Sequence, residues 1–130
     1  MRRYQRGNEH PEMRVTITRQ NIARYAGASG DFTRLHVDEA FAREAGHDSV
    51  FAMGMYTAGL AGTMMNQWLG VEHIDSFSVR FEDIVYPGDE ILYSAEIDER
   101  DGEQLEASFT ATNQDGETVL RGSVRATVDR

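Results

Sequence analysis

The order of apolar and polar positions along the chain predicts a strand and two short helices, followed much later by a series of strands. Residues 13–18 alternate between the two kinds of side chain, as expected for a strand with one buried face. Thr18 is a suitable N-cap for a helix over residues 19–28, and Asp38 for a second helix that ends near Gly46. The period of two returns after residue 72 and predicts four further amphipathic strands, near residues 76–81, 91–98, 105–112 and 120–128.

A run without any charged residue, residues 50–71, lies between these two parts, although 27% of the chain is charged. Such a run forms either a membrane span or a helix that protein encloses on nearly all sides. Its glycines and amide side chains, and the absence of a flanking basic cluster, argue against a span. Gly54, Ala58 and Gly62 form one helical stripe of small residues, which lets another backbone approach closely. We therefore predict a buried helix and no membrane span.

These elements together predict the α+β hot-dog fold, in which a curved antiparallel sheet wraps around a long central helix. The reason is that an amphipathic sheet must cover its apolar face, while a helix that is apolar all round must be enclosed. We expect one domain over residues 13–130, preceded by a loose N-terminal arm over residues 1–12. One copy would leave a sheet edge and a side of the helix open, so a homodimer is expected and a heterodimer is the alternative.

Composition narrows the classes of function. The chain has 22 acidic residues against 13 basic ones, all of them arginine, for a net charge of −9, which disfavours binding to nucleic acid. It has no cysteine, its four histidines share no ligand spacing, and no glycine-rich phosphate loop is present, so we expect neither metal nor cofactor. The first residues lack the apolar stretch of a secretory signal, and the prediction is a cytoplasmic protein.

Candidate chemistry lies just upstream of the charge-free run. Asp31 and His36 stand five residues apart in a loop between the two predicted short helices. A carboxylate and an imidazole at this spacing can converge on one water molecule, take a proton from it and return a proton to a substrate. The spacing alone is weak evidence, because such pairs are common and more often consist of a helix-capping aspartate beside an unrelated loop histidine.

The segment that contains this pair, YAGASGDFTRLH over residues 25–36, resembles the signature of the MaoC-like, (R)-specific enoyl-CoA hydratases. The likeness continues at Met53-Gly54-Met55 and through residues 79–89, in the same order and spacing. This resemblance implies a hot-dog fold and the interconversion of a trans-2-enoyl thioester and a (3R)-hydroxyacyl thioester. It further implies that Asp31 and His36 are the catalytic pair, that the Gly54 N–H stabilises the thioester oxygen, and that coenzyme A or an acyl carrier protein bears the acyl group.

Three positions depart from that signature: Thr33 stands where asparagine is usual, Arg34 where proline is usual, and Met53 where histidine or proline is frequent. Arg34 removes a rigid element beside the pair, or adds a cation near the phosphate-bearing end of the substrate. We predict contacts with substrate for four residues, Thr33, Met53, Met55 and Tyr56.

Two other functions remain open for the same fold. A hot-dog thioesterase would place an acidic residue on or beside the central helix, and residues 50–71 contain none. A non-catalytic subunit that pairs with an active partner would need neither Asp31 nor His36.

Overall fold

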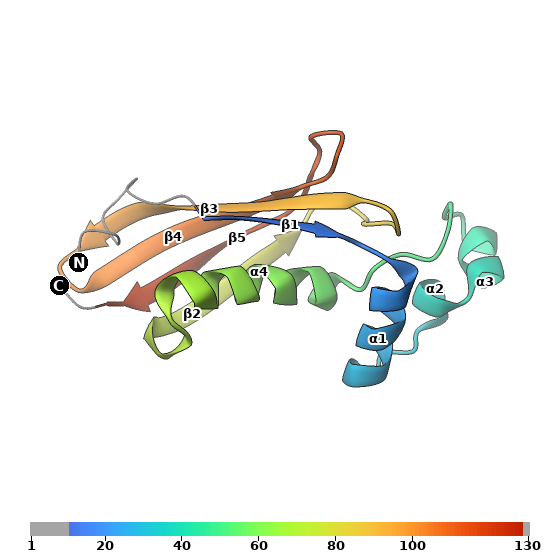
Figure 1. Ribbon diagram of the computed structural model, residues 1–130, viewed down its shortest axis with the longest axis horizontal. Coiled ribbons are helices and arrows are strands. Elements are labelled where there is room, and N and C mark those ends of the chain that lie inside the picture. Colours follow the sequence, from blue (N-terminus) through green and yellow to red (C-terminus); the bar gives the residue numbers. More distant parts are fainter. Residues whose placement is uncertain (1–10, 129–130) are drawn as a thin grey trace.

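The computed structural model describes residues 11–128, which form one five-stranded antiparallel sheet and a set of helices on one side of it (Figure 1). The strand order is β1-β3-β4-β5-β2, so that β1 and β2 are the two edges. The strands are β1 (Glu12–Thr16), β2 (Ile74–Phe81), β3 (Glu90–Asp101), β4 (Gln104–Thr112) and β5 (Thr118–Thr127). The helices are α1 (Arg19–Ser29), α2 (Arg34–Val37), α3 (Glu39–Glu44) and α4 (Gly54–Leu69), with a 3-10 turn over Val71–His73.

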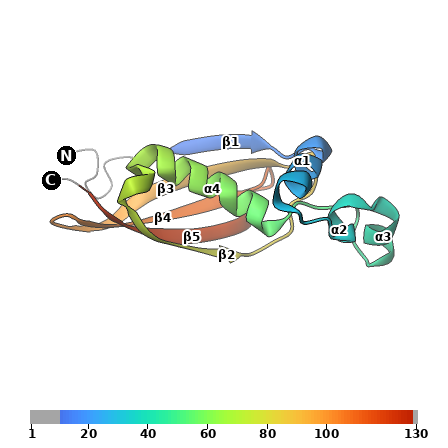
Figure 2. The same ribbon diagram turned by 90° about the horizontal axis from the view of Figure 1, so that it is seen from below.

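The predicted hot-dog architecture is confirmed. The long helix α4 lies along the inner face of the curved sheet, while α1, α2 and α3 gather beyond one end of the strands (Figures 1 and 2). The alternating apolar residues of β3, β4 and β5 are buried against α4. The Tyr93 hydroxyl on β3 donates a hydrogen bond of 2.9 Å to the carbonyl of Thr57 on α4. Trp68, near the other end of α4, is buried in the same core.

Capping side chains set the helix boundaries as the sequence predicts. The Thr18 hydroxyl accepts a hydrogen bond of 3.0 Å from the Asn21 N–H at the start of α1. Asp38 does the same for α3, where the Phe41 N–H lies 3.1 Å from its carboxylate. Gly30 ends α1 with a φ of 77°, a left-handed conformation that glycine adopts without strain. The short helix α2 was not predicted, because four residues are too few to show a helical period.

The charge-free run becomes a helix only in part, since α4 begins at Gly54 and ends at Leu69. Within residues 11–128, no helix combines the length and the apolar character that crossing a bilayer would require. The predicted N-terminal arm lies outside the described residues except for Pro11 and Glu12, and Glu12 is already the first residue of β1.

One side of the molecule remains apolar and open. The edge strand β2 forms as predicted, but its burial does not alternate, and its two aromatic residues, Phe77 and Phe81, are 40% and 49% exposed. Met55 on α4 is 62% exposed, and a groove of about 460 Å³ runs between this helix and β2. The small residues Ala58, Gly59 and Gly62 line the α4 side of the groove. A single chain therefore does not enclose its central helix.

Gly122 stands where the sheet leaves no room for a side chain. It lies on β5 opposite Val79 of β2. A Cβ atom at this position would collide with the Ser78 carbonyl oxygen and with the ring of Phe109. The Phe109 ring fills the space that the missing side chain leaves, and it stacks on Phe77 with 5.2 Å between ring centroids. The contact between β5 and β2 thus depends on glycine at position 122.

Candidate active site

Asp31 is held at the turn that follows α1. Its N–H donates a hydrogen bond of 3.2 Å to the Ser29 hydroxyl oxygen, and the Ser29 hydroxyl donates one of 2.7 Å to the Tyr25 carbonyl. The last turn of α1 therefore fixes the backbone of Asp31. The Asp31 side chain itself is 42% exposed.

His36 lies on α2 and is oriented by a backbone carbonyl. Its Nδ1 is 2.7 Å from the Phe51 oxygen, and its ring packs edge-on against the Phe51 ring with centroids 5.1 Å apart. A carbonyl oxygen can only accept, so Nδ1 carries a proton, and in the neutral imidazole Nε2 is the basic nitrogen. The His36 side chain is only 12% exposed. The basic nitrogen therefore points in a fixed direction, toward Asp31.

The two groups face one another across a gap that suits one water molecule. The His36 Nε2 and the Asp31 Oδ2 are 4.0 Å apart, which is too long for a direct hydrogen bond. A water molecule about 2.8 Å from each atom would donate one hydrogen to each at an angle of about 90°. Both hydrogens would then be engaged, and the oxygen lone pairs would point away from the pair.

Thr33 stabilises the charged form of the carboxylate. Its hydroxyl donates a hydrogen bond of 2.7 Å to Asp31 Oδ1, and its N–H donates one of 3.2 Å to the same atom. The side-chain bond and then the backbone bond from Thr33 hold the pKa of Asp31 below its ordinary value. Desolvation raises this pKa by less, and the electrostatic effect of His36, which is smaller again, lowers it. Asp31 is therefore an anion at neutral pH.

The start of α4 lies three residues after the Phe51 carbonyl that orients His36. Gly54 is the first residue of α4, and the N-cap Met53 provides no side-chain hydrogen bond. The first N–H groups of a helix lack intrahelical acceptors and carry its positive dipole end. The Phe81 ring lies against Gly54, because an added Cβ would be 3.0 Å from this ring.

The other predicted substrate contacts lie in three different surroundings. Met53 is buried in the core with 2% of its surface exposed, whereas Met55 is exposed and lines the groove beside β2. Tyr56 points toward α1, where its ring lies 5.3 Å from that of Tyr25, and burial raises its pKa. Thr33 binds Asp31, as described above.

Arg34, the residue in place of the usual proline, is engaged locally. Its guanidinium lies 3.1 Å from the Asp38 carboxylate and 4.2 Å from the centroid of the Phe41 ring. These contacts join α2 to α3 and supply the rigidity that loss of the usual proline was expected to remove. The Arg34 guanidinium, which was considered for contact with the substrate phosphates, is therefore already paired with Asp38.

Two contributors were not anticipated from the sequence: the carbonyl of Phe51 and the ring of Phe81. A backbone carbonyl leaves no trace in a pattern of side chains. Phe81 was expected in the sheet core, and only the position of β2 beside Gly54 places it at the helix start.

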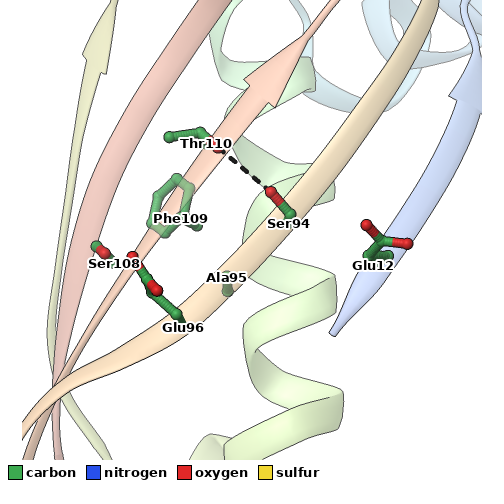
Figure 3. A pocket seen from close by; sticks show the side chains of 7 residues that line it. All are labelled: Glu12, Ser94, Ala95, Glu96, Ser108, Phe109 and Thr110. Atoms are coloured by element: carbon green, nitrogen blue, oxygen red, sulfur yellow. Dashed lines mark hydrogen bonds between the residues drawn. The ribbon is translucent and has the colours of Figure 1, made fainter. Parts of the chain in front are cut away.

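A separate hollow of about 300 Å³ lies over β3 and β4, on the face of the sheet away from α4 (Figure 3). Hydroxyl and carboxylate side chains surround it, and Ser94 and Thr110 lie within 3.3 Å of one another. None of the residues that line it belongs to the Asp31–His36 loop or to α4. Among residues 11–128, no group of three acidic or histidine side chains could hold a metal ion.

Comparison with known proteins agrees with this architecture. A family model described as a MaoC-like domain matches residues 5–118. No curated protein sequence gives a significant match to the chain.

Among solved structures, an (R)-hydratase from A. caviae involved in PHA biosynthesis is 23% identical, with a TM-score of 0.85 over 95% of this chain and 96% of that one. A protein from Archaeoglobus fulgidus titled monoamine oxidase regulatory protein is 30% identical, with a TM-score of 0.79 over 95% and 90% of the two chains. The ChsH1–ChsH2 complex from Mycobacterium tuberculosis contains a chain 21% identical, with a TM-score of 0.84 over 92% and 95%. For the two structures that are 23% and 21% identical, the likeness establishes the fold alone.

Proposed function

The chain belongs to the family of MaoC-like domains, and from this premise we propose that it is a hydratase that also catalyses the reverse dehydration. Its substrate is a trans-2-enoyl thioester, most simply of coenzyme A, and its product is a (3R)-hydroxyacyl thioester. The observation that carries this proposal is the 4.0 Å gap between Asp31 Oδ2 and His36 Nε2, which fits one bridging water.

In the forward direction, the water held by the pair adds its oxygen to C3 of the enoyl group. The His36 Nε2 takes one proton from that water as the C–O bond forms, while Asp31 keeps the second hydrogen in a hydrogen bond. The electrons of the double bond move toward the thioester oxygen. C2 then receives the proton that His36 took from the water. The sum is the addition of one water, and the side chains return to their initial states.

Negative charge that develops on the thioester oxygen requires a donor at that position. The Gly54 N–H, at the positive end of α4, is the candidate. The absence of a side chain lets the Phe81 ring lie against the helix start there.

The proposal is tested with purified protein and crotonyl-CoA or a longer enoyl-CoA. We expect loss of the absorbance of the conjugated thioester and formation of the (3R) alcohol, which chiral chromatography identifies. Release of free thiol at the same rate would instead establish a thioesterase. Turnover that appears only after a second hot-dog protein is added would establish a subunit of a heteromeric enzyme.

We further propose that the functional unit is a homodimer, in which a second copy covers the apolar side of α4 and the edge strand β2. The exposed Phe77, Phe81 and Met55 support this proposal, because an apolar surface of this kind is usually covered by a partner. Light scattering is expected to give twice the chain mass of 14.6 kDa. A mass of one chain would favour a heteromeric assembly.

The Gly54→Ala variant is expected to lose about 10-fold or more in kcat/KM, because the new methyl group displaces the Phe81 ring and disturbs the helix start that offers the backbone N–H. Its fold should persist, since the atoms that meet the methyl group belong to the tip of the Phe81 ring, which can move. Gly27→Ala in α1 is the matched control, because nothing lies within 4 Å of a Cβ at that position. Steady-state kinetics that are identical for the two variants would exclude Gly54 from the site.

A further inference from the structure

We infer that Thr33 is a positioning residue that holds Asp31 and His36 in register with one another. This inference rests on the proposed hydratase function and assigns a role to a residue for which the sequence suggested contact with substrate. Thr33 is the one residue of the described chain that hydrogen-bonds to both members of the pair.

The contacts of Thr33 divide the two carboxylate oxygens of Asp31 between two tasks. The hydroxyl and the N–H of Thr33 both donate to Oδ1, at 2.7 and 3.2 Å. The other oxygen, Oδ2, is the one that faces His36. Because rotation of a carboxylate about its last bond is intrinsically loose, two donors on one oxygen are what fix the direction of the other.

The backbone of the same residue connects to His36. The His36 N–H donates a hydrogen bond of 2.9 Å to the Thr33 carbonyl, which closes the first turn of α2. Thr33 therefore binds Asp31 through its side chain and N–H, and His36 through its carbonyl. A displacement of Thr33 would change the distance between the two groups that hold the water.

Threonine has two properties that suit this position. Its branched Cβ restricts rotation about χ1, so that the hydroxyl remains directed at Asp31. Its single hydroxyl proton is already used in the bond to Oδ1, and it has none left to donate to a substrate. The geometry therefore favours a positioning role over direct binding of substrate.

The other groups near Asp31 do not fix the direction of its carboxylate as Thr33 does. His36 is the titratable group that acts electrostatically on Asp31. Arg34, which follows Thr33 directly, is paired with Asp38 and lies over the Phe41 ring. On the α1 side, the Ser29 hydroxyl meets the Asp31 N–H and not its carboxylate.

The experiment compares Thr33→Val, which keeps the shape but loses the hydroxyl, with Thr33→Ser, which retains it. In Thr33→Val we expect kcat for enoyl-CoA hydration to fall about 10- to 100-fold, with KM changed by less than about 2-fold. Thr33→Ser should recover most of kcat. Thr112→Val on β4 is the matched control, because no hydrogen bond of the Thr112 side chain occurs in the described structure.

A second measurement does not depend on turnover. The side-chain carbon of Asp31, followed by carbon NMR through a pH titration, should report a higher pKa in Thr33→Val than in the wild type. The reason is that the hydroxyl bond favours the charged carboxylate. Thr33→Ser should leave this pKa near the wild-type value.

The outcomes separate the two proposals. A wild-type protein that hydrates no enoyl thioester overturns the hydratase function and, with it, the catalytic role of Thr33. An active wild type with an unchanged kcat in Thr33→Val overturns the positioning role alone. A rise in KM without a fall in kcat would also overturn it, and would assign Thr33 to substrate binding.

Discussion

Hydration of an enoyl thioester is expected to slow by at least ~10²-fold when Asp31 is replaced by asparagine or His36 by alanine, the scale of positioned acid–base catalysis. Asparagine keeps the shape of Asp31 but removes the negative charge that holds the second hydrogen of the water and stabilises the protonated imidazole. Alanine removes the basic Nε2 that the Phe51 carbonyl directs toward the water site. In both variants KM should change far less than kcat, because neither group is needed to hold the acyl carrier. Initial rates measured at saturating enoyl-CoA test this expectation.

His73 provides a matched control for His36. Its Nδ1 also lies near a backbone carbonyl, 3.1 Å from the Thr127 oxygen, and its Nε2 lies 3.3 Å from the Glu72 carboxylate. His73 lies just after the C-terminal end of α4, whereas Gly54 is the first residue of that helix. His73→Ala should therefore retain hydration activity. An equal loss in the two histidine variants would mean that a general effect on the fold, and not chemistry at His36, explains the result.

The double variant Asp31→Asn/His36→Ala adds a stricter test. Two groups that act on one water molecule are used as a unit, so that removing the second costs little once the first is gone. We expect the double variant to be only slightly slower than the slower single variant. Rate losses that multiply would indicate two independent roles and would contradict the bridging water.

The second large effect concerns stability. Gly122→Ala is expected to lower the free energy of unfolding by about 2–3 kcal/mol, as overpacking in a tight core does. The new methyl group would meet a backbone oxygen of β2 and the Phe109 ring, and the oxygen cannot move without separating the two strands. Urea unfolding followed by circular dichroism measures the change.

Two further variants show whether the cause is steric. Ser123→Ala, the next residue on β5, removes only the 2.9 Å hydrogen bond with Ser78, and is expected to cost about 1 kcal/mol or less. Phe109→Leu combined with Gly122→Ala should be more stable than the sum of the two single effects, because the smaller side chain makes room for the methyl group. Strict additivity would show that the Phe109 ring is not the obstacle.

Local signals in the sequence account for most of the fold. Thr18 and Asp38 each cap a helix as predicted, because capping depends on one side chain and its immediate neighbours. The period-two strands also follow from nearest-neighbour alternation. The exposure of Phe77 and Phe81 could not be predicted in the same way, since it depends on β2 being the edge strand. Alternation identifies the inward face of a strand but not whether anything covers it.

Predictions for the candidate site divide along a similar line. The spacing of Asp31 and His36 suggested a pair that could share one water, which stays a prediction, and the structure places the two groups 4.0 Å apart. The position of Met53 does not favour its predicted contact with substrate, because its side chain is buried in the core. The direction of a side chain at a helix start depends on packing several elements away. For the same reason, the roles of Arg34 and Thr33 became visible only with the contacts they make.

The orientation of His36 by the Phe51 carbonyl has a consequence for how this site tolerates mutation. Every amino acid supplies a main-chain carbonyl, so an exchange at position 51 can alter packing but cannot delete the acceptor. A mutational scan would therefore record position 51 as permissive for chemistry and demanding only for shape. The imidazole is anchored by the path of the chain into α4, and this anchor persists in any variant that keeps that path.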